Sequence, residues 1–286
     1  MCRLVGWSGE RARTLADLLG ADALALFTDL SAIHGHGWGF GYRDPSTGRP
    51  RTIRSTRRAR DDPDFAKAAH TLAVPAAVVH LRWASPGYGE GLTNTHPFTA
   101  DDWSLIHNGA IGPNSRIDDL LHPVSERRPL GSTDSERLLL AVLDELGPSG
   151  AEAQGAQLAA AIERVSTRAV QAGLTASSLN LMMLGPSGLH VLNWHDDSQV
   201  PPIQADDPSL PPYYDLRHRL DHGTHVAASS GFVPDAGGEW ELLPNASLLS
   251  LGPGTPELRD VRPDLALCPV PATSRCASGN TAGHEN

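Results

Sequence analysis

The chain lacks a long hydrophobic run and has few cysteines, and each absence excludes a class of protein. No apolar stretch approaches the roughly 18 residues that a membrane-spanning helix needs. The first seven residues also lack the apolar segment of a signal peptide. Three cysteines (Cys2, Cys268 and Cys276) form an odd, sparse set that suits a reducing compartment better than a disulfide scaffold. The sequence therefore predicts a cytoplasmic protein.

Basic side chains are scarce relative to acidic ones. The 286 residues include 23 Lys and Arg against 33 Asp and Glu, so the formal net charge at pH 7 is -10. A protein that binds the phosphate backbone of nucleic acid needs a basic excess. The one basic cluster has acidic neighbours at Asp44, Asp61, Asp62 and Asp64, and we interpret it as a solvated loop. Its members are Arg51, Arg54, Arg57, Arg58 and Arg60. We expect no nucleic-acid partner and no membrane partner.

The remaining composition is typical of a globular protein with a sizeable core, because 40% of the residues are hydrophobic and 20% are charged. The length allows two domains, or one domain followed by a tail. Beyond about Gly252 the chain is rich in Pro, Gly, Ser and Asn. We therefore predict one domain over residues 2–251 and a disordered tail over residues 252–286.

The hydrophobic pattern predicts strands, then paired helices, then strands again. The expected strands cover residues 4–7, 38–42, 77–83, 103–107, 179–184, 189–193, 226–229 and 247–251. Helices are expected over residues 11–19, 64–72 and 151–171, and a fourth begins at a capping box, Thr133-Asp134-Ser135-Glu136, and ends at Gly147-Pro148. Residues 196–223, with five prolines, are expected to form a loop. This order favours an α+β fold over alternating βαβ units.

Cys2 is the first candidate for chemistry. Its side chain is small enough to permit removal of Met1, which would leave a cysteine with a free α-amine. The pKa of such an amine, about 7.7–8.0, is close to the thiol's roughly 8.5, so the amine can accept the thiol proton near neutral pH. The alternative is a cysteine at position two by chance, and this residue alone does not decide between them.

A polar cluster lies at the end of the apolar strand at residues 77–80. Arg82 offers a planar fork that suits a carboxylate. Asn108-Gly109 supplies a side-chain amide and an unhindered backbone N–H, the donors that an oxyanion hole needs. Taken singly, each has a simpler structural explanation: an ordinary ion pair for Arg82 and a hairpin turn for Asn108-Gly109.

Taken together and in order, the motifs resemble the class-II glutamine amidotransferases, which are N-terminal-nucleophile enzymes. The motifs are Cys2, His34-Gly35-His36-Gly37-Trp38-Gly39, the strand that carries Arg82, Asn94-Thr95-His96-Pro97-Phe98, His107-Asn108-Gly109 and Thr133-Asp134-Ser135-Glu136. The resemblance covers about residues 2–251. It implies a four-layer αββα sandwich of two antiparallel sheets and the hydrolysis of a γ-glutamyl amide without a cofactor.

The resemblance also implies roles for individual residues. Cys2 would be the nucleophile, and Asn108 and Gly109 would form the oxyanion hole. Arg82 would hold the α-carboxylate of the substrate, and Asp134 would hold its α-ammonium group. The other substrate-binding residues would be Trp83, Ser85 and His107.

The implied function is cleavage of the γ-amide of glutamine to glutamate and ammonia, with a separate synthase subunit as the partner that receives ammonia. One alternative is a hydrolase of a larger γ-glutamyl conjugate, like the ergothioneine-pathway relatives of the family. Two departures concern the substrate: His36 stands where many relatives carry an acidic residue, and Ser85 replaces a common threonine.

Two further alternatives remain at this stage. An acylase-like hydrolase would also begin with cysteine, but it does not explain Arg82 together with Asp134, a pair suited to a zwitterionic head. A non-catalytic binding or regulatory relative would retain the pocket without turnover. Histidines with spacings compatible with a metal lie in the Gly-rich motif (His34 and His36) and in the expected loop (His218, His222 and His225), and we predict no metal site there.

Overall fold

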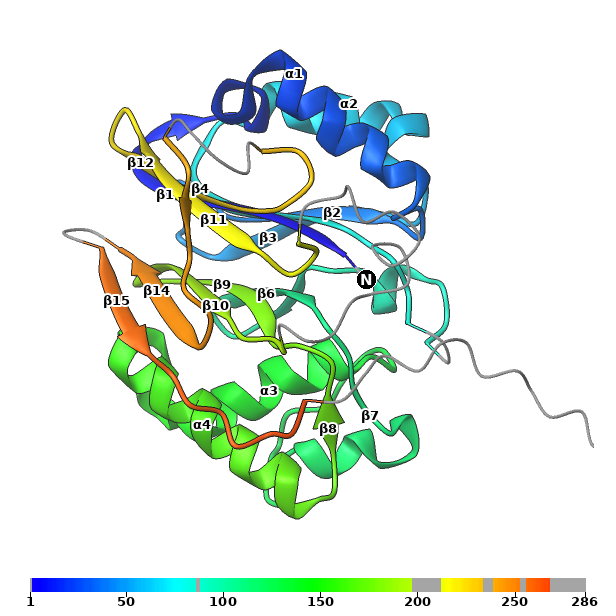
Figure 1. The fold of residues 1–286 in the computed structure, drawn as a ribbon, viewed down its shortest axis with the longest axis vertical. Helices are drawn as coiled ribbons and strands as arrows, with labels where there is room; N and C mark the ends of the chain where they lie inside the picture. Colours follow the sequence, from blue (N-terminus) through cyan, green and yellow to red (C-terminus); the bar gives the residue numbers. More distant parts are fainter. Residues whose placement is uncertain (1, 86–87, 197–211, 234–238, 253–255, 268–286) are drawn as a thin grey trace, which may run out of the picture.

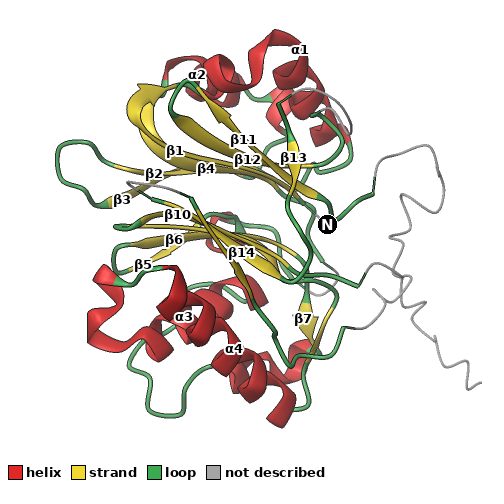
Figure 2. Cartoon of the chain, turned by 60° about the vertical axis from the view of Figure 1, so that its left-hand side comes forward, coloured by secondary structure: helices red, strands yellow, loops and turns green. Residues whose placement is uncertain are grey.

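The computed structural model describes residues 2–85, 88–196, 212–233, 239–252 and 256–267. Two antiparallel sheets lie face to face, and a layer of helices covers the outer face of each sheet (Figures 1 and 2). This arrangement confirms the predicted α+β class and the four-layer αββα sandwich.

The first sheet has seven strands in the order β13-β11-β12-β1-β4-β2-β3. Their bounds are β1 (Arg3–Arg13), β2 (Trp38–Arg43), β3 (Pro50–Ser55), β4 (Val74–Leu81), β11 (Leu216–Asp221), β12 (Thr224–Ser229) and β13 (Glu241–Leu242). The helices α1 (Leu15–Asp29) and α2 (Pro63–Thr71) cover its outer face (Figure 1). Short 3-10 helices, η1 (Leu30–Ala32) and η2 (Ala59–Asp61), follow α1 and precede α2.

The second sheet has six strands in the order β15-β14-β10-β9-β6-β5. Their bounds are β5 (Phe98–Ala100), β6 (Trp103–Asn108), β9 (Asn180–Gly185), β10 (Gly188–Asn193), β14 (Ser247–Leu251) and β15 (Glu257–Asp260). The helices α3 (Asp134–Leu146) and α4 (Gly155–Gln171) cover it, and β7 (Ile111–Gly112) pairs with β8 (Thr175–Ala176). The remaining 3-10 helices are η3 (Leu92–Asn94), η4 (Asn114–Leu120) and η5 (Gly147–Glu152). Among the described helices, none is both long and apolar enough to cross a membrane.

Most of the central strands bury both of their faces, which explains their nearly continuous apolar sequences. In β1, Val5 and Trp7 pack in the core beneath α1 and α2, whereas Leu4 belongs to the core between the two sheets. In β6, Leu105 faces the core shared with α3 and α4, and Ile106 faces the other sheet. Side chains alternate along a strand, so β1 and β6 each contribute to two of the three hydrophobic cores.

The predicted start of α3 is confirmed. Thr133 is the N-cap, and its Oγ1 accepts the backbone N–H of Glu136 at 3.3 Å. The reciprocal half of the expected capping box does not form, because the Glu136 carboxylate accepts the backbone N–H groups of Leu130 and Gly131 at 2.9 and 2.7 Å. Glu136 therefore fixes the segment that leads into the helix.

The predicted start of the first helix is wrong. β1 continues to Arg13, and α1 begins at Leu15 instead of Arg11. The N-cap is Thr14: its Oγ1 accepts the Asp17 N–H at 3.0 Å, and Asp17 Oδ2 accepts the Thr14 N–H at 3.0 Å. This capping box sets the helix start and leaves the preceding residues free to extend the strand.

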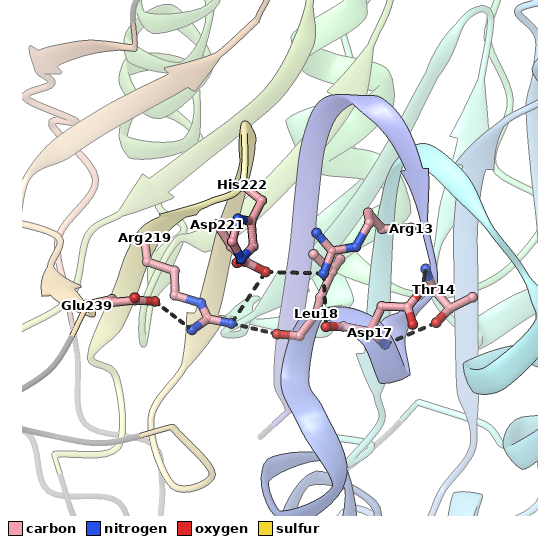
Figure 3. A network of polar contacts seen from close by, with 8 residues as sticks. All are labelled: Arg13, Thr14, Asp17, Leu18, Arg219, Asp221, His222 and Glu239. Atoms are coloured by element: carbon pink, nitrogen blue, oxygen red, sulfur yellow. Dashed lines mark hydrogen bonds and ion pairs between the residues drawn. The ribbon is translucent and has the colours of Figure 1, made fainter.

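The expected loop at residues 196–223 contains β11, so that expectation is also wrong in part. β11 forms a hairpin with β12, and the turn residues His222 and Gly223 both have positive φ, 48° and 82°. A polar network ties this hairpin to the start of α1 (Figure 3). In it, Asp221 contacts both Arg13 and Arg219, at 3.3 and 3.8 Å, and thus links the two segments.

The packed chain continues past the domain boundary that composition placed at Leu251. β15 pairs with β14, and the buried side chains of Val261 and Leu265 join the core shared with α4. The Leu265 N–H donates to Ser166 Oγ of α4 at 2.7 Å. Two apolar anchors in a polar, Pro-rich segment are too few to stand out in the sequence. Residues 268–286, the rest of the expected tail, lie outside the described residues.

Candidate active site

A small pocket, partly open to solvent, lies where the ends of β1, β4 and β6 meet the start of α3. Seven of the eight site residues proposed from the sequence line it: Cys2, Arg82, Trp83, Ser85, His107, Gly109 and Asp134. The eighth, Asn108, contacts the backbone of Cys2. A wider groove between α1 and α2 contains none of these residues.

Cys2 precedes β1 and is held by contacts from both sheets. The β1–β4 register pairs Arg3 with Leu81, which brings Cys2 alongside the segment that follows β4. The Trp83 N–H donates to Cys2 Sγ at 3.4 Å, and the Cys2 N–H donates to Asn108 Oδ1 at 2.8 Å. The Cys2 side chain is buried. The N-terminal end of the chain lies where the two sheets meet (Figure 1).

Asn108 and Gly109 come from the second sheet, at the end of β6. Because the Cys2 nitrogen is a donor, the amide oxygen of Asn108 must face it, which leaves Nδ2 as the donor end of the side chain. At Gly109, a Cβ would lie 2.1 Å from the carbonyl oxygen of Ser178, so the close approach requires glycine. These residues are not a hairpin turn, since β6 pairs with β5 and β9 and not with the strand that follows it.

Arg82 is a buried cation, 2% exposed, and its fork is held by backbone carbonyls. Nη1 donates to the carbonyl oxygen of His36 at 3.4 Å, and Nη2 donates to that of Gly89 at 3.1 Å. Burial lowers the pKa of Arg82, and the nearby Cys2 and Glu90 oppose this. None of the ion pairs formed by the described residues includes Arg82, so the ordinary ion-pair explanation does not hold. A buried guanidinium without a carboxylate is suited to receive one.

Asp134 is the first residue of α3 and is 3% exposed. Its Oδ2 accepts the backbone N–H of Ile111 at 2.7 Å, and the hydroxyl of Ser135 lies 3.3 Å from Oδ1. The first turn of a helix favours a negative charge. The protein thus places a fixed carboxylate in the wall of the same pocket that contains the Arg82 guanidinium.

His107 lines the pocket, but its two ring nitrogens are occupied within the protein. The carbonyl of Ser178 can only accept, so Nε2 carries the proton and donates to it at 3.2 Å. Nδ1 then accepts from the Ser135 hydroxyl at 3.0 Å. The sequence placed His107 among the substrate-binding residues, whereas this geometry favours a supporting role for the strand end that carries Asn108.

Two more imidazoles are buried beside His107. His80 Nε2 donates to the His107 carbonyl at 3.2 Å, and the ring of His96 lies 4.1 Å from that of His80. Burial lowers the pKa of His80 to about 3, that of His96 well below its usual value, and that of His107 in the same direction. At neutral pH these rings are uncharged, so they do not compete with Arg82 for an anion.

His36 and His34 support the Arg82 segment. The Ala84 N–H donates to His36 Nδ1 at 3.0 Å, and the ring of His34 packs edge-on against that of Trp83 at 5.7 Å. In the described part of the chain, no three His, Cys, Asp or Glu side chains gather closely enough to hold a metal ion.

Sequence reasoning missed several residues of the pocket wall, namely Tyr88, His96, Thr133 and Ser135. Thr133, Ser135 and His96 belong to motifs that the sequence analysis quoted, so their motif membership was an available signal. Tyr88 had none. Burial and the nearby Asp134 raise the pKa of Tyr88, which keeps its hydroxyl protonated as a donor, 3.5 Å from the carbonyl oxygen of Ile111.

Comparison with known proteins adds family and fold relationships. The family profile "glutamine amidotransferases class-II" matches residues 1–192. A γ-glutamyl-hercynylcysteine sulfoxide hydrolase from Mycolicibacterium smegmatis is 31% identical over 119 residues, which cover 39% of this chain and 52% of that protein. The protein of the same name from Mycobacterium tuberculosis is 29% identical over 118 residues, which cover 39% and 50%. The chain therefore spans about half the length of the curated relatives it matches.

Two solved structures share the fold. A glutamine aminotransferase class-II domain protein from Silicibacter pomeroyi superposes with a TM-score of 0.61 at 21% identity, covering 92% of this chain and 100% of that one. A predicted glutamine amidotransferase from Pseudomonas aeruginosa gives a TM-score of 0.50 at 16% identity, with coverages of 89% and 99%. At these identities the similarity concerns the fold alone.

Proposed function

Because this chain belongs to the class-II glutamine amidotransferase family, we propose that it is an N-terminal-nucleophile enzyme in which Cys2 cleaves a γ-glutamyl amide. The observation that carries the proposal is one pocket lined by the Cys2 thiol, the Arg82 guanidinium and the Asp134 carboxylate. An anion receptor and a cation receptor recognise the zwitterionic head of an amino acid, while the thiol faces its side-chain amide. A cytoplasmic location is part of the proposal.

The first half of the proposed reaction forms a thioester. Removal of Met1 turns the Cys2 nitrogen into an α-amine, which accepts the thiol proton. The sulfur attacks the γ-carbonyl carbon, and the electron pair of the C=O bond moves to oxygen. Asn108 Nδ2 and the Gly109 N–H donate to this oxyanion. When the carbonyl re-forms, the C–N bond breaks and the leaving amine takes the proton from the α-ammonium group.

The second half releases glutamate. The α-amine accepts a proton from water, whose oxygen attacks the thioester carbonyl carbon at the position that the amine has left. The same two donors stabilise the second oxyanion. Collapse breaks the C–S bond, and the sulfur recovers its proton from the α-ammonium group. Glutamate leaves, and no redox change or cofactor is involved in this scheme.

Glutamine is the substrate we propose first, with ammonia passed to a separate synthase subunit. A second candidate is a larger γ-glutamyl conjugate, which is supported by the names of the two curated mycobacterial relatives. The two candidates differ only in the group attached to the γ-nitrogen, so the receptors for the head serve both of them.

A panel of γ-glutamyl amides with amines of increasing size tests the choice. We expect the isolated protein, shown by intact mass to begin at Cys2, to release glutamate from glutamine, slowly without its partner. Glutamate and the released amine are measured for each compound. Inert glutamine beside a rapidly cleaved bulky amide would establish the conjugate hydrolase. No turnover of any member by protein that begins at Cys2 would favour the non-catalytic relative.

The head-group assignment is tested by Arg82→Lys and Asp134→Asn. Arg82→Lys keeps the charge but loses the fork, and Asp134→Asn removes the counter-charge of the α-ammonium group. We expect each to weaken binding of the transition state by roughly 2–5 kcal/mol, seen as a loss in kcat/KM of roughly 30- to 5,000-fold. Arg51→Lys and Asp119→Asn, at exposed ion pairs outside the pocket, serve as matched controls.

Substrates provide the complementary test of the head-group assignment. Removing either the α-carboxylate or the α-ammonium group from the substrate is expected to make it poor for the wild-type enzyme. Equal rates on glutamine and on a simple acyl amide would contradict the roles of Arg82 and Asp134. They would favour the acylase-like hydrolase instead.

A further inference from the structure

Arg3 is a charged residue buried beside the proposed nucleophile. It is 6% exposed, and its guanidinium carbon lies 4.0 Å from the centre of the Tyr213 ring. Gly231 lies against the same group, since a Cβ there would be 3.5 Å from Arg3 Nη2. The ion pairs of the described residues do not include Arg3. The described part of the chain thus buries a cation without giving it a carboxylate, which is costly unless the charge has another use.

The contacts of Arg3 converge on the backbone of Cys2. Arg3 Nη1 donates to the carbonyl oxygens of Cys2 and Tyr213, both at 3.4 Å, and the Tyr213 hydroxyl donates to the same Cys2 oxygen at 3.2 Å. With its nitrogen bound to Asn108 and its sulfur contacted by the Trp83 N–H, Cys2 is fixed at three separate groups.

We propose that Arg3 and Tyr213 are positioning residues for Cys2, which fix its carbonyl group and place a positive charge beside this residue. The proposal rests on the proposed function, because it requires Cys2 to be the nucleophile.

The need for contacts that fix the Cys2 carbonyl group follows from the position of Cys2 in the chain. Once Met1 is removed, no peptide bond precedes Cys2, and terminal residues are poorly ordered unless they are tied down. A misplacement of the reacting atom by about 1 Å can cost roughly 100-fold in rate. Holding the carbonyl oxygen restricts rotation of the terminal residue and keeps the sulfur in the pocket. The Tyr213 hydroxyl can do this over a wide pH range, since burial raises the pKa of Tyr213 and keeps it a donor.

The charge of Arg3 has a second consequence. Burial lowers the pKa of Arg3, while Tyr213 and Cys2 act in the opposite direction, so the guanidinium and the sulfur influence each other electrostatically. A guanidinium stays protonated at all physiological pH values. The thiolate that forms during the reaction is an anion that this cation can stabilise, as cations do for other reactive cysteines.

The test compares Tyr213→Phe, Arg3→Met and Arg3→Lys with the wild type. Tyr213→Phe keeps the ring that stacks on Arg3 and removes only the hydroxyl. Arg3→Met removes the charge, and Arg3→Lys retains it without the fork. Tyr214→Phe is the matched control, because Tyr214 is also a buried tyrosine, with its ring 5.3 Å from that of Tyr213, but its hydroxyl interacts with Ser177.

The rate of covalent labelling by a glutamine-mimicking diazoketone is measured by mass spectrometry at the Cys2 peptide, over a range of reagent concentrations. We expect the maximal labelling rate to fall roughly 10-fold for Tyr213→Phe and roughly 100-fold for Arg3→Met, with the half-saturating concentration changed less than about twofold. Arg3→Lys should recover part of the loss, and Tyr214→Phe should label like the wild type. A merely structural role would not separate rate from binding in this way.

Two outcomes would overturn the proposal. One is a Tyr213→Phe protein that melts like the wild type and labels at the wild-type rate; the other is a change confined to the half-saturating concentration. If Arg3→Met fails to fold, the labelling rate of Tyr213→Phe alone decides whether the proposal stands. Failure of the wild-type protein to label at Cys2 would instead refute the proposed function, so the two failures are distinguishable.

Discussion

Cys2→Ala is expected to reduce turnover of a γ-glutamyl amide by at least roughly 1,000-fold, measured as glutamate release. The substitution removes the covalent route but leaves Arg82, Asp134 and the oxyanion donors in place. Substrate binding should therefore survive while chemistry fails. Isothermal titration of Cys2→Ala with the preferred substrate should give a dissociation constant within a few-fold of the wild-type KM if acylation limits the rate.

The other two cysteines provide the controls. Cys268→Ala and Cys276→Ala should retain wild-type turnover, and a diazoketone analogue of glutamine should add a single label at the N-terminal peptide. An active Cys2→Ala protein, or a label on Cys268 or Cys276, would rule out the proposed nucleophile.

Asn108→Ala is expected to lower kcat by roughly 100- to 1,000-fold, as loss of one oxyanion donor does in other enzymes. The side chain has two tasks, because Oδ1 accepts the Cys2 N–H at 2.8 Å and Nδ2 is the end left for the substrate oxyanion. Asn108→Asp separates them: it keeps an oxygen for the Cys2 nitrogen and replaces the donor by an oxygen that repels the oxyanion.

We therefore expect Asn108→Asp to be at least as inactive as Asn108→Ala, with diazoketone labelling of Cys2 as the second readout. Asn114→Ala, at an exposed position at the start of η4, is the control for the loss of an amide. Wild-type kcat in Asn108→Asp would mean that the side chain only anchors Cys2 and that the oxyanion is stabilised elsewhere.

Except for β11, the central strands could be predicted from the sequence, whereas the edges of the sheets could not. The edge strands are β13 and β3 in one sheet and β15 and β5 in the other, and the hydrophobic pattern predicted none of them. Central strands bury both faces and so have apolar sequences. An edge strand such as β3 (PRTIRS) is held by main-chain pairing with its neighbour, which leaves its side chains free to be polar.

The candidate site also contains residues that could be predicted from the sequence and residues that could not. Cys2, Arg82, Asn108 and Asp134 lie in short motifs at the ends of predictable elements, so their convergence on one pocket followed from the resemblance. Tyr213 lies 211 residues from Cys2, in a segment expected to be a loop, and no local pattern connects the two. Only the three-dimensional structure reveals such a contact.

The origin of the site in two sheets has a consequence for the timing of its appearance during synthesis. The Cys2 thiol emerges from the ribosome before both of its partners, because the amide that binds its nitrogen follows 106 residues later and the Tyr213 hydroxyl 211 residues later. Domains acquire their structure as the chain emerges, N-terminus first. A nascent chain therefore carries the proposed nucleophile long before it has the partners that orient it, and we expect competence for the proposed reaction only when the second sheet has docked on the first.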